Sequence, residues 1–227
     1  MQYEMRGGAM PVVECHLEPG EAMKCESGSM VWMSDGLKLE TKGGGIGKLF
    51  SKVVSGENMF ENIYRAPRGG MIAFGSSYMG SIVACEVSGG REIICQKSAY
   101  LCATEGVERT TVFQKKLGSA LFGGEGFIMQ KISGNGIVFL EIDGTAINYD
   151  LAPGERMIID TGFLAIMDAT CQMDVEKVQG GLKNMAFGGE GIFNTVVTGP
   201  GRITLQTMPK PAFVSSILHL LPTSGKQ

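Results

Sequence analysis

A glycine-rich sequence that occurs three times limits what this chain can fold into. Residues 122–127 read FGGEGF, residues 187–193 read FGGEGIF, and a weaker copy at residues 55–60 reads SGENMF. Their marker glycines, which lie 68 and then 65 residues apart, are Gly56, Gly124 and Gly189. A near-constant spacing of this length indicates an internal repeat. The chain is therefore expected to contain three copies of one structural repeat.

The turns predict that each repeat is built from short strands. The 34 glycines are about twice the average share, but they lack the three-residue period of collagen. Pro19-Gly20 and Pro153-Gly154 each follow a segment in which apolar and polar residues alternate. Proline presets φ and glycine accepts the positive φ of a type II turn. We therefore expect hairpins there and an all-β fold of short antiparallel strands.

Other segments recur at the same spacing. Three short apolar runs are predicted to be buried strands, namely residues 29–33, 99–103 and 163–167. The last hairpin of each repeat is expected to turn at Gly70, Gly136 or Gly201. Apolar residues at helical spacing predict one short helix per repeat, at residues 46–53, 117–121 and 182–186.

These patterns predict one β domain over residues 1–209, with repeats at about 1–75, 76–141 and 142–209. A single repeat buries little surface and leaves sheet edges open, so three are expected to close around an approximate internal threefold. Residues 210–227 form a tail with a short amphipathic helix. Its apolar stripe, which is expected to contact the domain itself, a second subunit, a partner or a membrane, consists of Phe213, Val214, Ile217, Leu218 and Leu221.

The cysteines are interpreted as reduced, buried side chains. The six cysteines show no metal-type spacing, and Cys15 to Cys85 and Cys25 to Cys95 are both 70 residues apart. The third repeat has Tyr149 and Ile159 at the corresponding positions, which a shared disulfide or metal role would not tolerate. Residues 1–6 lack a signal-peptide pattern, so a reducing cytoplasm is the expected location.

The motifs that carry chemistry in other proteins are incomplete here. Residues 42–49 resemble a phosphate-binding loop but have Lys42 and Leu49 where the motif needs Gly and Ser or Thr. The repeated glutamates Glu57, Glu125 and Glu190 are interpreted as turn residues, with a carboxylate cluster as the alternative. The two histidines, His16 and His219, fit no usual metal spacing. No catalytic residue, metal or cofactor is predicted.

Several lysines lie around the predicted helices. If the repeats surround a common axis, these lysines form a basic rim that would contact phosphate or anionic lipid. The alternative is a solvated helix face. The candidate residues are Lys42, Lys48, Lys52, Lys115 and Lys116. The net charge of −3 makes nucleic acid an unexpected partner.

Three features together resemble the AIM24 family, formerly a domain of unknown function with bacterial, archaeal and mitochondrial members. They are the Pro-Gly-Glu turn followed by GSMV at residues 28–31, the segment ETKGG at residues 40–44 with its amphipathic helix, and the recurring GGEGF. The resemblance covers about residues 1–209. It implies a β fold of the TRAP-like kind, named after the tryptophan-sensing RNA-binding attenuation protein. It implies no established activity and no catalytic residues, and mitochondrial relatives are associated with inner-membrane organisation.

The sequence therefore predicts a protein without enzymatic activity. The leading hypothesis is a scaffold or interaction protein that forms a homo-oligomer and contacts a partner or membrane through its tail. The alternative is a sensor that binds a small ligand or metabolite between repeats, by analogy with the fold. A third hypothesis is an enzyme that uses the repeated glutamates.

Overall fold

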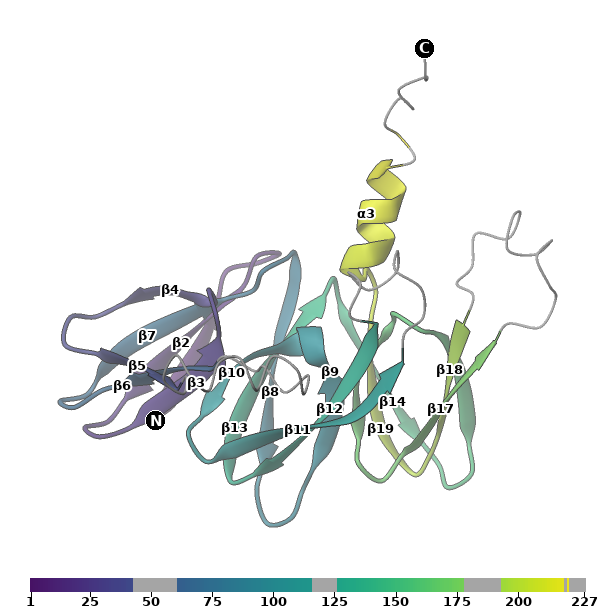
Figure 1. The fold of residues 1–227 in the computed structure, drawn as a ribbon, viewed down its shortest axis with the longest axis horizontal. Helices are drawn as coiled ribbons and strands as arrows, with labels where there is room; N and C mark the ends of the chain where they lie inside the picture. The colour runs from purple at the N-terminus through teal and green to yellow at the C-terminus, as the bar shows by residue number, and fades with distance from the viewer. Residues whose placement is uncertain (43–60, 116–125, 178–192, 219, 221–227) are drawn as a thin grey trace, which may run out of the picture. The chain divides into compact units, whose positions relative to one another are not determined.

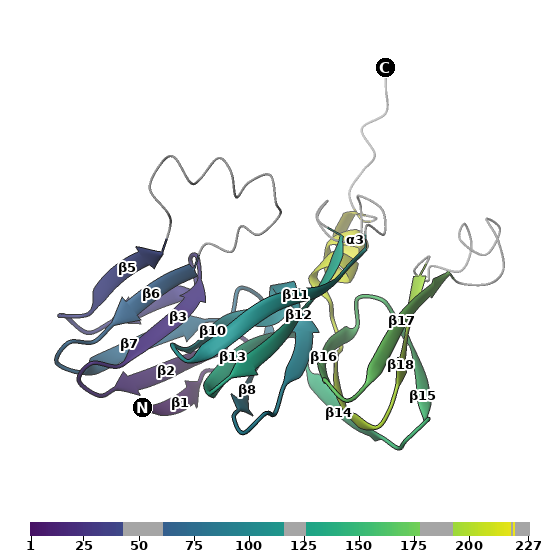
Figure 2. The same cartoon turned by 60° about the horizontal axis from the view of Figure 1, so that its bottom comes forward.

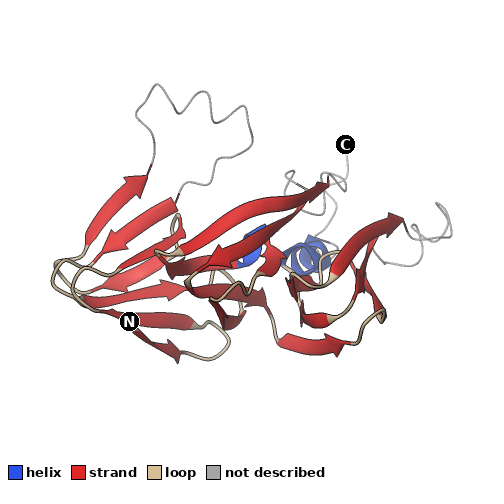
Figure 3. Cartoon of the chain, turned by 90° about the horizontal axis from the view of Figure 1, so that it is seen from below, coloured by secondary structure: helices blue, strands red, loops and turns tan. Residues whose placement is uncertain are grey.

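The computed structural model describes residues 1–42, 61–115, 126–177, 193–218 and 220. Strands dominate this part of the chain, together with one 3-10 helix, η1 (Lys97–Ala99), and one α-helix, α3 (Lys210–Leu218) (Figures 1 and 3). The predicted mainly β architecture is confirmed. The strands are β1 (Gln2–Arg6), β2 (Val12–Leu17), β3 (Ala22–Glu26), β4 (Met30–Met33), β5 (Lys38–Lys42), β6 (Glu61–Arg65), β7 (Gly70–Gly75), β8 (Gly80–Val87), β9 (Ile93–Gln96), β10 (Tyr100–Thr104), β11 (Val107–Lys115), β12 (Phe127–Gly134), β13 (Gly136–Asp143), β14 (Ala146–Leu151), β15 (Arg156–Asp160), β16 (Leu164–Asp168), β17 (Gln172–Lys177), β18 (Phe193–Thr198) and β19 (Gly201–Gln206).

The chain divides into two compact units, and each unit contains two sheets. The first unit, residues Met1–Gly90, Ser98–Glu108 and Ser133–Glu141, holds the sheets β1-β2-β7-β4 and β5-β6-β3-β10-β13-β8. The second unit, residues Arg91–Lys97, Arg109–Ile132 and Ile142–Gln227, holds β11-β12-β9-β16-β19-β14 and β15-β18-β17. Each unit thus combines strands from more than one predicted repeat. The predicted helices at residues 46–53, 117–121 and 182–186 lie outside the described residues.

The order of strand pairing is the same in three successive groups of six strands. In β2–β7, the first strand pairs with the sixth and the sixth with the third, giving β2-β7-β4. The fourth strand pairs with the fifth and the fifth with the second, giving β5-β6-β3. The groups β8–β13 and β14–β19 have the same order. Between groups, the second strand of one pairs with the third strand of the next, at β3·β10 (Figure 2) and at β9·β16.

The two Pro-Gly turns form as the sequence predicts. Gly20 has φ 89°, and the Glu21 N–H donates to the Glu18 carbonyl at 3.1 Å. The same turn at Gly154 has φ 78° and a 3.0 Å bond from the Glu155 N–H to the Ala152 carbonyl. In both turns the glutamate carboxylate also accepts the backbone N–H three residues before it, at 2.7 and 2.8 Å. The glutamate that follows each Pro-Gly pair therefore stabilises the turn.

The sixth strand of each group starts at a glycine with positive φ. These are the three predicted hairpin glycines Gly70, Gly136 and Gly201, with φ 149°, 153° and 146°. The next residue in each case donates its backbone N–H to a side chain at or just after the end of the third strand. The acceptors are Ser34 Oγ at 2.9 Å, Thr104 Oγ1 at 3.0 Å and Asp168 Oδ2 at 2.8 Å. An added Cβ would collide with side chains at all three glycines, so this junction requires glycine.

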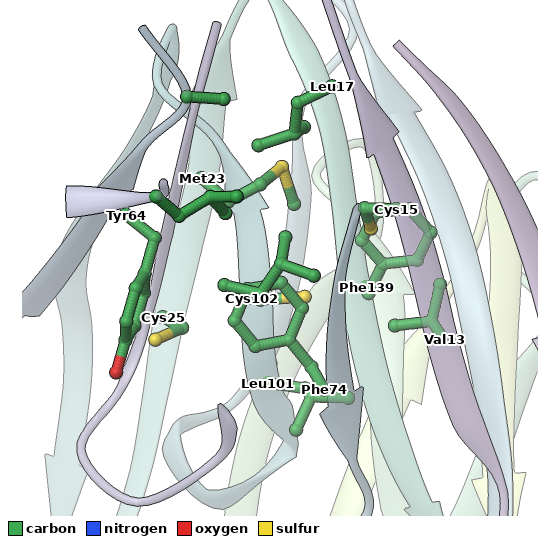
Figure 4. Close-up of a cluster of buried hydrophobic side chains, with 13 residues drawn as sticks. Val13, Cys15, Leu17, Met23, Cys25, Tyr64, Phe74, Leu101, Cys102 and Phe139 are labelled. Atoms are coloured by element: carbon green, nitrogen blue, oxygen red, sulfur yellow. The ribbon is translucent and has the colours of Figure 1, made fainter. Parts of the chain in front are cut away.

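The core of the first unit packs between its two sheets. Phe74 and Phe139 are fully buried there, and Tyr64 meets Phe74 edge-on with ring centroids 6.4 Å apart (Figure 4). The second unit has its own core, in which Phe127 meets Phe113 edge-on at 6.0 Å. Each core draws on strands from both of its sheets, as expected for sheets packed face to face.

Candidate functional site

The exposed apolar strand β4 is the feature that the sequence reasoning missed. Residues 29–33 were expected to form a buried strand, but Val31, Trp32 and Met33 are 48%, 45% and 40% exposed. This prediction is wrong because β4 lies at the edge of its sheet and, among the described strands, pairs only with β7. The equivalent strands β10 and β16 are buried, as predicted, because each pairs on both sides.

A second exposed edge lies in the other compact unit. Strand β15 ends the sheet β15-β18-β17, and its Ile158 is 68% exposed. The equivalent strands β3 and β9 pair on both sides and are largely buried. The only signal for these edges in the sequence is the position of the two strands. β4 belongs to the first repeat and β15 to the last, and each of these repeats has a neighbouring repeat on one side only.

The tail helix is the third exposed apolar element. α3 starts where the Lys210 N–H donates to Asp143 Oδ2 at 2.8 Å, and Pro211 occupies the first turn, where proline is well tolerated. No residue of α3 is buried, and Val214, Ile217 and Leu218 are 51%, 41% and 59% exposed. Figure 1 shows α3 pointing away from the strands of its own unit. The predicted tail helix is therefore present, while Leu221 lies outside the described residues.

Two of the five candidate lysines, Lys42 and Lys115, lie in the described part of the chain. Lys42 ends β5 and Lys115 ends β11, so both close the fourth strand of their group. Lys115 Nζ donates to the Val175 carbonyl at 3.1 Å and lies 5.8 Å from the centre of the Phe193 ring. Its ammonium group thus contacts its own unit. Lys48, Lys52 and Lys116 lie outside the described residues, so the basic rim stays a prediction.

The candidate acidic and imidazole groups form no shared site in the described part of the chain. His16 is exposed on β2, while His219, Glu57, Glu125 and Glu190 lie outside the described residues. Within the described ranges, no cluster of three or more His, Cys, Asp or Glu side chains could hold a metal ion. The hypotheses of a glutamate enzyme and of a ligand sensor stay predictions.

The buried carboxylate of Glu141 is held by hydrogen bonds. Glu141, on β13, is 8% exposed. It accepts the Ser77 backbone N–H at 2.6 Å, the Ser76 hydroxyl at 3.0 Å and the Ser77 hydroxyl at 2.8 Å. Because these donors satisfy the carboxylate, its role is to fix the loop that follows β7.

All six cysteines are reduced thiols outside any disulfide, and five are buried, as the sequence predicts. Cys15, Cys25 and Cys102 share the core of the first unit, and Cys102 lies opposite Cys25 across β10 and β3 (Figure 4). Burial raises the pKa of Cys15 to about 12 and also raises the pKa of Cys102. These thiols are protonated at neutral pH and act as small apolar side chains rather than nucleophiles.

The raised pKa of Cys15 predicts a loss of stability in alkali. The folded state keeps this proton above the ordinary pKa of 9.0, whereas the unfolded chain releases it. The contribution is present in full below pH 9 and declines as the pH rises towards the folded value. Between pH 8 and pH 10 we expect Cys15 to reduce the free energy of unfolding by about 1.4 kcal/mol.

Urea denaturation at both pH values measures this loss. The Cys15→Ala variant should lose about 1.4 kcal/mol less than the parent chain between pH 8 and pH 10. Val13→Ala, which truncates a non-titrating residue of the same core, should follow the parent chain. Equal pH dependence in the parent and Cys15→Ala would contradict the assignment.

Comparison with known proteins identifies the family. A family model described as "Mitochondrial biogenesis AIM24" matches residues 3–208. The chain belongs to the AIM24 family. The resemblance expected from the sequence is therefore confirmed.

Two relatives extend the comparison across almost the whole AIM24-family chain. An uncharacterized protein of Streptococcus pyogenes serotype M6 is 31% identical over 230 residues, which cover 97% of this chain and 90% of that protein. A crystal structure of a Streptococcus pyogenes protein matches with a TM-score of 0.80 and 25% identity, covering 97% of this chain and 99% of the other. AIM24 membership thus fixes the fold and assigns no reaction.

Proposed function

We propose that the chain is a non-enzymatic scaffold that lies against an anionic membrane surface through α3. The observation that carries this proposal is that α3 buries none of its residues and leaves three large apolar side chains exposed. Single exposed apolar residues are ordinary, but several on one short helix favour an interaction site. The resemblance of the chain to mitochondrial relatives associated with inner-membrane organisation supports the same proposal.

The scaffold itself is proposed to consist of three copies of one TRAP-like repeat. The shared pairing order of β2–β7, β8–β13 and β14–β19 supports this proposal. The fourth strand of each group also ends in a lysine, at Lys42, Lys115 and Lys177. A reducing cytoplasm is the proposed location, because buried cysteines in the reduced state suit a reducing compartment.

The length of α3 sets the expected strength of membrane binding. The helix has nine residues, and no helix among the described residues is long and apolar enough to span a bilayer. A short interfacial helix buries little apolar surface, so one copy is expected to bind weakly. Several copies held in one assembly would bind more tightly through avidity.

Co-sedimentation with anionic liposomes tests the proposal. The full chain is expected to sediment with the vesicles, and a chain ending at residue 209 is expected to stay in solution. Replacing Ile217 and Leu218 with serine should weaken binding by about tenfold or more, because their apolar surface is lost. Ser216→Ala, on the same helix, should bind like the parent chain. Failure of every form to bind would end the membrane proposal.

A further inference from the structure

We propose that β15 of one chain adds to the free edge of β4 in a second copy of this chain, so that sheets continue from chain to chain. This inference rests on the two sheet edges and does not depend on whether α3 binds a membrane. The partner is a second copy of this chain, and its β15 is expected to pair antiparallel with β4.

The pairing pattern within the chain supplies the first argument. The second strand of a group pairs antiparallel with the third strand of the next group at β3·β10 and again at β9·β16. By the same rule, the third strand of the first group and the second strand of the last group lack a partner from a neighbouring group among the described strands. These are β4 and β15, which end their sheets. The two ends of the series are therefore complementary.

The register of the two observed junctions fixes the register of the proposed one. Each third strand has a bulge at the same place, between Met30 and Trp32, Tyr100 and Cys102, or Leu164 and Ile166. Directly after the bulge, Cys102 lies opposite Cys25 and Ile166 lies opposite Cys95.

The next pairs in these junctions are Ala103 with Lys24 and Met167 with Ile94. Transferring this register places Trp32 opposite Ile159 and Met33 opposite Ile158 of the second copy.

Exposure of the same positions supplies the second argument. Met33 is 40% exposed, whereas its equivalents Ala103 and Met167 are 0% and 2% exposed. Trp32 is 45% exposed, against 0% for Cys102 and 5% for Ile166. Apolar side chains at these positions are thus buried wherever the neighbouring strand is present. The exposed apolar surface of β4 matches what a second copy would cover.

The third argument is the absence of edge protection. Natural sheet edges usually carry charged residues or proline that discourage further pairing. Among the described strands that end a sheet, β4 alone has no charged residue, since it reads MVWM. The other described edges, β1, β5, β8, β11, β14, β15 and β17, each contain at least one charged residue. Strand β4 therefore has the composition of a strand that is paired in the assembled protein.

Such an interface joins two different surfaces, because each chain uses its β15 edge to contact one neighbour and its β4 edge to contact another. Interfaces of this head-to-tail kind generate closed rings or filaments rather than simple dimers. The pairing would also add backbone hydrogen bonds along the strand, as in β-strand addition.

Cysteine cross-linking between separately prepared variants tests both the partner and the register. One sample carries Met33→Cys and the other carries Ile158→Cys, and they are mixed under mild oxidation. Because a disulfide needs closely placed Cβ atoms, the mixture should give about fivefold more cross-linked dimer than Met33→Cys mixed with Asp160→Cys. The product should run at twice the chain mass of 24.2 kDa on a non-reducing gel.

A double variant that carries Met33→Cys and Ile158→Cys in the same chain distinguishes pairing of β4 with β15 between chains from pairing of these strands within one chain. If β4 pairs with β15 of the same chain, as an internal threefold requires, the double variant forms an internal disulfide at the mass of one chain. That result, with no cross-link between the mixed single variants, would overturn the proposal.

Sedimentation of the unmodified full chain without lipid gives an independent readout. The parent protein should have the mass of several chains, and Ile158→Lys should reduce it to the mass of one chain that still unfolds cooperatively, because Ile158 is 68% exposed within its own chain. Ile147→Lys, at an exposed position on edge strand β14, should leave the assembly intact. A parent protein that is monomeric at tens of micromolar, or an Ile158→Lys variant that stays assembled, would show that the proposal is wrong.

Discussion

Replacing Phe139 with alanine is expected to destabilise the first compact unit by about 3 to 5 kcal/mol. Phe139 is fully buried on β13 and packs in the core that also contains Phe74 and Cys102. Its ring meets Tyr3 edge-on, with centroids 4.9 Å apart. The substitution removes a large apolar side chain and leaves a cavity that neighbouring strands cannot fill without breaking their pairing.

Urea denaturation followed by tryptophan fluorescence measures this effect. Trp32 is the single tryptophan of the chain and lies in the first unit, so its emission reports the unfolding of that unit. Tyr149→Ala, which truncates an aromatic side chain that is 45% exposed in the second unit, is the control and should leave the transition nearly unchanged. A change below about 1 kcal/mol for Phe139→Ala would be inconsistent with a close-packed core.

Replacing Gly136 with alanine is expected to destabilise the same unit by about 2 to 4 kcal/mol, combining backbone strain with a steric clash. Gly136 has φ 153°, and its added Cβ would overlap Thr104 Oγ1 and approach Val107 Cγ2 to 3.2 Å. Thr104 cannot turn away freely, because the same oxygen accepts the Ile137 N–H at 3.0 Å. The clash therefore also breaks the hydrogen bond that joins β10 to β13.

Two other glycines of the first unit separate the strain from the clash. Gly20 has φ 89° but no atom within 4 Å of an added Cβ, so Gly20→Ala should show backbone strain alone, about 1 kcal/mol. Gly8 has neither positive φ nor a close neighbour, so Gly8→Ala should have little effect. The same fluorescence measurement ranks the three variants. Equal losses for Gly136→Ala and Gly20→Ala would mean that Thr104 moves without cost.

The features that the sequence predicted well depend on local backbone geometry. The Pro-Gly turns at Gly20 and Gly154 and the hairpin glycines Gly70, Gly136 and Gly201 adopt the positive φ that their residue types suggest. The tail helix also follows from its own spacing of apolar residues. These predictions hold because the preference acts within a few residues of the chain.

The candidate site could be predicted only in part. The apolar residues of α3 were identified from the sequence, since helical spacing places them on one face. The exposed edge β4 was missed because Met30-Val31-Trp32-Met33 has the same apolar character as the buried strands β10 and β16. Sequence composition does not record whether a neighbouring strand is present.

By itself, the sequence determined the β-rich fold, the turns, the spacing of the repeated segments and the reduced state of the cysteines. Only the tertiary structure decided which strands share a sheet, that Cys25 lies opposite Cys102, and that β4 and β15 remain at edges. Turns and strand periodicity arise from the conformations of neighbouring residues. Burial and pairing depend on contacts between segments that lie far apart in the chain, and these contacts exist only once the sheets have formed.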